Sequence, residues 1–199
     1  DDGERALAEA IPELRKAGSY GVSLALGALA NGRFNQGRFN QAERGYREAL
    51  DEARRSEHVY SIAVAMAGVG RSLVASGQPA AARPVLIEAR ERFQELTVAP
   101  GIVDSSTLLG VAERDLGDLP AAARHLLEAL VETGIHWSED ADFWTLQFAA
   151  AIISDRAAAA VLVGAVMAAY ERSSVDQSAF VIGDLNALRD RLITEFDSD

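Results

Sequence analysis

Three segments that each begin with a glycine recur at an interval of 40 residues: Gly37-Arg38-Phe39-Asn40-Gln41-Ala42, Gly77-Gln78-Pro79-Ala80-Ala81-Ala82 and Gly117-Asp118-Leu119-Pro120-Ala121-Ala122. The register extends to both sides of these glycines. Small residues lie seven positions before them: Ala30, Gly70 and Gly110. Large residues lie nine positions after them, and alanines twelve: Tyr46, Leu86 and Leu126, then Ala49, Ala89 and Ala129. A pattern that recurs three times in phase predicts an internal structural repeat.

Each of these glycines is expected to lie between two helices. Without a Cβ, glycine readily adopts the left-handed conformation just beyond a helix end. Pro79 then falls near the start of the next helix, where its missing N–H costs nothing, and Asp118 can cap the same point in the third segment. The small residues predict close helix contacts, and the large residues fill the space between them. Each repeat is therefore predicted to be a helix-turn-helix unit.

The 40-residue register predicts an all-α chain, a single solenoid domain over residues 1–199. The expected units span about 20–56, 57–97 and 98–134, with a degenerate pair at 139–172 and a capping helix at 179–196. An amphipathic helix from Glu4 to Ala17 precedes them. Ser56 is expected to cap the helix that starts at Glu57, and Ala99-Pro100-Gly101 is expected to form a loop. No segment alternates like a strand, so no sheet is predicted.

The residues of this register resemble the tetratricopeptide (TPR) family. Leu109-Gly110 followed by Gly117-Asp118 matches the small residue late in the first TPR helix and the Gly-Asp turn. The usual TPR period is about 34 residues, and the longer period here predicts that each helix gains most of a turn. The resemblance implies a TPR-like right-handed superhelix of antiparallel helix pairs.

A second resemblance lies toward the C-terminal end. The run from Ala159 to Ala165, followed by Tyr170-Glu171-Arg172, is similar to the C-terminal helical region of large actinobacterial STAND-type regulators. Many of these regulators end in a LuxR-type DNA-binding domain. Leu185 to Leu192 occupies the position of their closing helix. The resemblance implies the sensor or assembly region of a signalling or transcriptional regulator, with the ATP and DNA sites outside this chain.

The composition narrows the classes of partner. The formal net charge is −11 and the pI is about 4.7. Nucleic acids and anionic membranes are themselves negative, so neither is expected as a direct partner. Cysteine is absent, which excludes disulfides, Cys-zinc sites and thiol catalysis. The acidic start Asp1-Asp2-Gly3-Glu4 is unlike a signal peptide, and no apolar run reaches the roughly 20 residues of a membrane span, so a cytoplasmic protein is expected.

Motifs that carry chemistry were not found in the sequence. The three histidines, His58, His125 and His136, are scattered, and neither a phosphate-binding loop nor a nucleophile elbow is present. The segment from His136 to Trp144 is the densest polar and aromatic cluster. It is either a ligand-binding loop or a helix start capped by Ser138, and the helix start is the favoured interpretation. We expect no enzyme, no cofactor and no metal.

The inner groove of a TPR-like array is the remaining candidate site. The resemblance places groove residues on the first helix of each pair, just after the small residue and one turn later: Asn31, Phe34, Asn35, Arg71, Val74 and Arg114. Asparagine can hold a peptide backbone, and arginine can bind a carboxylate. Gly27 and Gly68 stand where chaperone-type clamps place polar residues, so that clamp is not expected. The competing interpretation of the predicted set is a solvated face.

Two functions of different classes follow. The leading hypothesis is a non-catalytic protein-interaction module whose partner is a protein or peptide, including other domains of the same regulator. The alternative is a receptor that binds a small molecule or a signalling peptide in the concave groove. An enzyme of unrecognised type ranks third. The sequence leaves the oligomeric state open.

Overall fold

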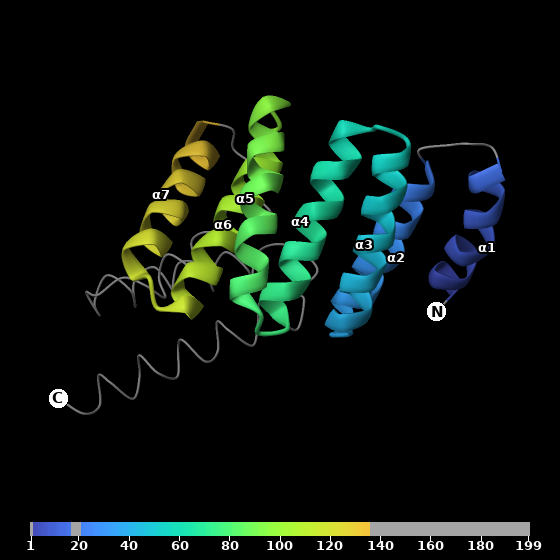
Figure 1. Ribbon diagram of the computed structural model, residues 1–199, viewed down its shortest axis with the longest axis horizontal. Coiled ribbons are helices and arrows are strands. Elements are labelled where there is room, and N and C mark those ends of the chain that lie inside the picture. The colour runs from blue at the N-terminus through green and yellow to red at the C-terminus, as the bar shows by residue number, and fades with distance from the viewer. Residues whose placement is uncertain (1, 17–20, 136–199) are drawn as a thin grey trace, which may run out of the picture.

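The chain folds as a row of helices that follow one another in space as they do in sequence (Figure 1). The computed structural model describes residues 2–16 and 21–135. Within these ranges it contains α1 (Asp2–Lys16), α2 (Gly21–Asn35), α3 (Phe39–Arg55), α4 (Val59–Ala75), α5 (Pro79–Glu95), α6 (Ala99–Leu116) and α7 (Leu119–Ile135). Successive helices pack together, and α4 also contacts α2 and α6. The predicted all-α, TPR-like array of helix pairs is confirmed.

Two predicted boundaries were wrong. Ala99-Pro100-Gly101, expected as a loop, forms the first turn of α6. Proline is tolerated there because the N–H groups of a first turn have no intrahelical acceptor. The N-cap of α4 is His58 rather than Ser56, and its Nδ1 accepts a hydrogen bond from the Ser61 N–H at 3.3 Å. Ser56 instead ends α3. The predicted pair at 139–172 and capping helix at 179–196 lie outside the described residues.

Each turn between α2 and α7 contains one residue in the left-handed conformation. These residues recur at every twentieth position, with φ between 52° and 86°: Gly37, Glu57, Gly77, Thr97 and Gly117. In the turn after α4, the Gly77 N–H bonds to the Val74 carbonyl at 3.0 Å, and the Gln78 N–H bonds to the Leu73 carbonyl at 2.8 Å. This Schellman arrangement satisfies carbonyls at the helix end. A 17-residue helix such as α4 and a three-residue turn together make half of the 40-residue repeat.

The small and large residues of the register meet where helices cross. A Cβ added to Gly70 would overlap Leu86, and one added to Gly110 would overlap Leu126. The alanines five positions after the turn glycines are fully buried: Ala42, Ala82 and Ala122. Close backbone approach lets the large side chains fill the gap without leaving voids, which is the packing that protein cores require.

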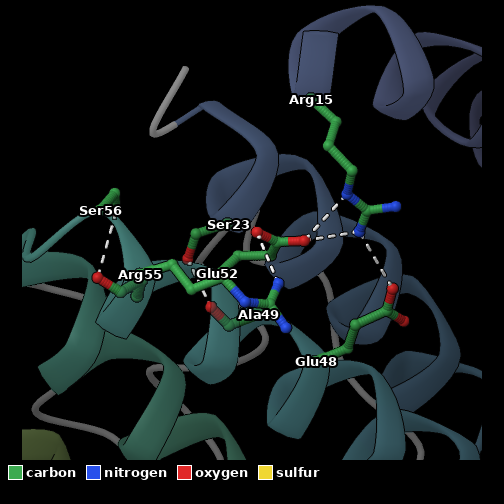
Figure 2. Close-up of polar contacts among 8 residues, drawn as sticks. Arg15, Ser23, Glu48, Ala49, Glu52, Arg55 and Ser56 are labelled. Carbon is green, nitrogen blue, oxygen red and sulfur yellow. Dashed lines mark hydrogen bonds and ion pairs between the residues drawn. The ribbon is translucent and has the colours of Figure 1, made fainter. Parts of the chain in front are cut away.

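Charged side chains join the C-terminal end of α1 to α3 (Figure 2). Arg15 donates two hydrogen bonds to Oε1 of Glu52, at 2.6 and 2.9 Å, and reaches Glu48 at 3.5 Å. Arg55 approaches the other oxygen of Glu52 at 3.0 Å. Glu52 therefore lies between two guanidinium groups, one of which comes from α1.

The N-terminal end of α1 is held in the same way. Glu4 accepts hydrogen bonds from Arg33 at 3.1 Å and from Arg38 at 2.9 Å. These two arginines are equivalent residues of a tandem Gly-Arg-Phe-Asn-Gln sequence at 32–36 and 37–41. Ile11 is the one buried residue among those of α1 whose exposure is described. Ion pairs therefore contribute more to the docking of α1 than they do to the packing among α2 to α6.

Thr97→Gly is expected to raise the free energy of unfolding by about 1 kcal/mol, because a β-branched residue is strained at positive φ. Thr97 is exposed, so its removal sacrifices no core packing. Gly77→Ala places a Cβ in the equivalent strained conformation and is expected to lower the same free energy by a similar amount. Urea denaturation measures both. Unchanged midpoints for the two variants would contradict the role given to these turns.

The docking of α1 is expected to weaken as the pH falls. Hydrogen bonds from Arg33 and Arg38 lower the pKa of Glu4. Burial tends to raise the pKa of Glu52, but hydrogen bonds from Arg15 and Arg55 outweigh that effect and lower it. A carboxyl whose pKa is lowered on folding stabilises the fold above its unfolded pKa, and this contribution is lost on acidification. Hydrogen-exchange protection of α1 should therefore fall from about pH 5 downward.

Glu52→Gln should reduce this pH dependence, because the amide cannot titrate. Glu91, exposed on α5 without an ion pair to any described residue, provides the matched control Glu91→Gln, which should leave the pH profile of α1 intact. Equal profiles for all three proteins would show that Glu52 does not control the docking of α1.

Candidate functional site: the groove across α2, α4 and α6

A cavity of about 480 Å³ lies between the first helices of successive pairs, α2, α4 and α6. Helices α3 and α5 contribute Tyr46 and Phe93. Most of its lining comes from positions related by the 40-residue register: Leu24, Val64 and Asp104; Gly27 and Ala67; Ala28 and Gly68; Asn31 and Arg71; Tyr60 and Pro100; Ser61 and Gly101. The cavity, called the groove below, is therefore formed by the same face of each first helix.

Small residues keep the floor of the groove open. Ala28 and Ala67 line it together with two glycines, Gly27 and Gly68. A Cβ at Gly68 would overlap the ring of Tyr46, which packs directly against α4 at this point. Glycine at this position therefore allows the Tyr46 ring to be buried while its hydroxyl reaches the groove.

Arg71 is held in place at one end of the groove. Its Nη2 donates to Oδ1 of Asn31 at 2.8 Å and to the hydroxyl of Tyr46 at 2.6 Å. The guanidinium carbon lies 4.6 Å from the ring centroid of Phe34 and 5.9 Å from that of Tyr46. Stacking on aromatic rings and hydrogen bonds to neutral acceptors fix the cation without neutralising its charge.

The Tyr46 hydroxyl links the two hydrogen-bonding partners. It accepts from Arg71 and donates to Oδ1 of Asn31 at 3.3 Å. Burial raises the pKa of Tyr46, and the nearby charge of Arg71 opposes that rise. The pKa stays above that of a free tyrosine, so the hydroxyl keeps its proton and its role as a donor at neutral pH.

Asp104 brings an acidic side chain to the same groove. It makes no hydrogen bond or ion pair with any described residue, and it keeps contact with solvent. Desolvation by neighbouring protein atoms raises the pKa of Asp104, and the positive charge of Arg71 counteracts the effect.

The other end of the groove is apolar. Leu24 and Tyr60 line it although 47% and 44% of their surfaces are exposed, and Val64 occupies the register position of Leu24 one repeat later. The Tyr60 ring meets that of Phe93 edge to face, with centroids 6.3 Å apart. Exposed apolar side chains gathered in a concavity are typical of a binding surface.

The six residues predicted for the groove have different positions. Asn31 and Arg71 line it and contact each other. Phe34 and Val74 are buried in the core, and Phe34 supports Arg71 from below. Asn35 is exposed at the end of α2, away from the cavity lining, and Arg114 of α6 pairs with the adjacent Asp115 at 2.8 Å, also away from it.

The sequence prediction missed several residues of the groove. It extended the predicted row of groove residues toward the wrong end of each helix. The prediction started at Asn31 and Arg71 and moved one turn toward the C-terminus, where the helix face turns into the core. The groove instead continues toward the N-terminus, through Ala28 and Leu24 in α2 and through Gly68 and Val64 in α4. Asp104 could have been found by moving 40 residues on from Val64.

The other sequence candidates do not form a site in the described residues. His58 caps α4. Nδ1 of His125 lies 3.1 Å from Nη1 of Arg90 and 3.4 Å from Oε2 of Glu128. No three His, Asp or Glu side chains in residues 2–16 and 21–135 are grouped so that they could hold a metal. The segment from His136 to Trp144 lies outside the described residues. None of the described helices combines the length and the apolar content needed to cross a bilayer.

Comparison with known proteins supports the fold. No protein-family model matches the chain, and no curated protein matches it either. Among solved structures, the crystal structure of the apo form of RapI superposes with a TM-score of 0.64 at 15% sequence identity. The match covers 98% of this chain, which spans 60% of the length of RapI. At this identity the similarity establishes a TPR-like helical-repeat fold and no more.

Tyr46→Phe is expected to lower the free energy of unfolding by about 1–2 kcal/mol, because it removes an acceptor of a charged donor in a partly buried site. Tyr60→Phe is the matched control. The Tyr60 hydroxyl bonds to no described residue, so its loss should change stability by less than about 0.5 kcal/mol. Equal effects of the two substitutions in denaturant titrations would contradict the hydrogen-bond network assigned to Tyr46.

Proposed function

We propose that this chain is a non-catalytic, regulatory protein-interaction module that binds its partner in the groove. The observation that carries the proposal is the groove itself, which combines an apolar end with a fixed arginine and an aspartate that pairs with none of the described residues. Polar groups that are held in place before binding lower the entropy cost of binding. The match to RapI supports a repeat fold, which presents such surfaces along its length.

The similarity of residues 159–172 to STAND-type regulators supports a more specific role. In this role the chain is the sensor or assembly region of a larger bacterial signalling or transcriptional regulator in the cytoplasm. Its partner is then a protein, a peptide or another domain of the same regulator. The acidic charge of −11 argues for such partners and against direct contact with nucleic acid.

A second candidate function is a receptor for a small molecule or a signalling peptide. The groove volume of about 480 Å³ supports it, because ligand sites typically enclose about 300–1,000 Å³. The two candidates use the same residues, and they differ in whether the occupant is a folded partner or a small ligand.

Affinity capture from native cytosol with the full chain tests the leading proposal. The groove variant combines Asn31→Ala with Arg71→Glu. Its matched control combines Gln41→Ala with Arg44→Glu on the exposed surface of α3, outside the cavity lining. A partner that is lost with the groove variant and kept with the control, and that binds again as a purified protein, is the expected result. A purified partner that binds the folded groove variant as strongly as the unmodified chain would place the interface elsewhere.

A further inference from the structure

Arg71 and Asp104 face the same groove without forming an ion pair. Asp104 is exposed to solvent and Arg71 is half-buried, so both charges keep part of their hydration. Here Asn31, Tyr46 and the ring of Phe34 hold the guanidinium where it is. The two opposite charges therefore remain separate, and each can contact a ligand in the groove.

Both groups have unused hydrogen-bonding capacity. Nη2 of Arg71 is occupied by Asn31 and Tyr46, whereas Nη1 bonds to no described residue. Nε of Arg71 is buried, so Nη1 is the donor that a ligand can reach. The carboxyl group of Asp104 accepts no hydrogen bond from the described residues. The groove therefore offers donors on one side and acceptors on the other.

Most of the remaining lining is apolar and defines the rest of the ligand, and the hydroxyl groups of Ser23 and Ser61 already contact protein groups. Leu24, Tyr60 and Val64 present aliphatic and aromatic surface to the cavity. The floor beside them carries only hydrogen or methyl groups, at Gly27 and Ala67 among others. An aliphatic or aromatic side chain fits this surface, while a second charged group would lose its hydration without finding a partner.

From this arrangement we infer that the groove binds a free α-amino acid with an apolar side chain. The ligand carboxylate binds Arg71, its ammonium group binds Asp104, and its side chain contacts Leu24, Tyr60 and Val64. This inference rests on the proposed function in one respect, because it takes the groove as the binding site. It deepens the second candidate function, because it names the chemical class of the small ligand.

Isothermal titration calorimetry on the full chain tests the inference, with L-leucine and L-phenylalanine as probes. Binding is expected for at least one of them. Arg71→Gln and Asp104→Asn should each weaken binding about tenfold or more, since each removes a charged hydrogen bond. Arg44→Gln and Asp51→Asn, exposed on α3, are the matched controls and should leave the affinity unchanged.

Modified ligands assign the two contacts and keep the test valid if a variant folds poorly. N-acetyl-L-leucine lacks the ammonium group, and L-leucinamide lacks the carboxylate. Each should bind the unmodified chain about tenfold or more weakly than L-leucine. Asp104→Asn should not weaken N-acetyl-L-leucine further, and Arg71→Gln should not weaken L-leucinamide further. Equal affinities for all three ligands would overturn the assignment.

Two other results would also overturn the inference. One is the absence of heat from either amino acid at millimolar concentration. The other is binding of the peptide Leu-Leu-Leu alone, which would make the ligand a peptide. In both cases the proposed function stands if the groove variant still loses its protein partner. The proposed function fails on its own if that partner binds the groove variant as strongly as it binds the unmodified chain.

Discussion

The left-handed residue at every twentieth position is the constraint on which the rest of the structure depends. It ends each helix with the same pair of backbone hydrogen bonds, so one helix and one turn always use 20 residues between α3 and α5. Equal lengths bring position n of one first helix beside position n + 40 of the next. Glycine meets this constraint without strain at Gly37, Gly77 and Gly117, whereas Glu57 and Thr97 adopt the same conformation with strain.

Because the helices have equal lengths, the sequence repeat produces two repeated surfaces, one for packing between helices and one that lines the groove. On one face, Gly70 and Gly110 accept Leu86 and Leu126, and the helices of a pair come close. On another face, equivalent residues of α2, α4 and α6 line the groove. A change in turn length would rotate one first helix relative to the next. It would remove Leu24, Val64 and Asp104 from their common face.

The site uses the core to orient a charge. Phe34 is buried, and the guanidinium of Arg71 stacks on its ring. Tyr46 is buried against Gly68, and its hydroxyl accepts a hydrogen bond from the same guanidinium. Rigid aromatic rings thus replace the carboxylate that would normally pair with arginine. This explains how Arg71 and Asp104 line one cavity without forming an ion pair with each other.

The sequence by itself determined the repeat, the helix pairs, the turn glycines and the close contacts at Gly70 and Gly110, because backbone conformation and local packing follow from residue size and spacing. It also proposed Asn31 and Arg71 for the groove, and both residues line the cavity. The left-handed conformation of Glu57 and Thr97 was not predictable, since neither residue prefers it, and the helical start of α6 was hidden by Pro100. Only the tertiary structure decided which helix face lines the groove. That choice depends on how neighbouring pairs rotate against each other, so Phe34 and Val74 were assigned to the groove while Leu24, Val64 and Asp104 were missed.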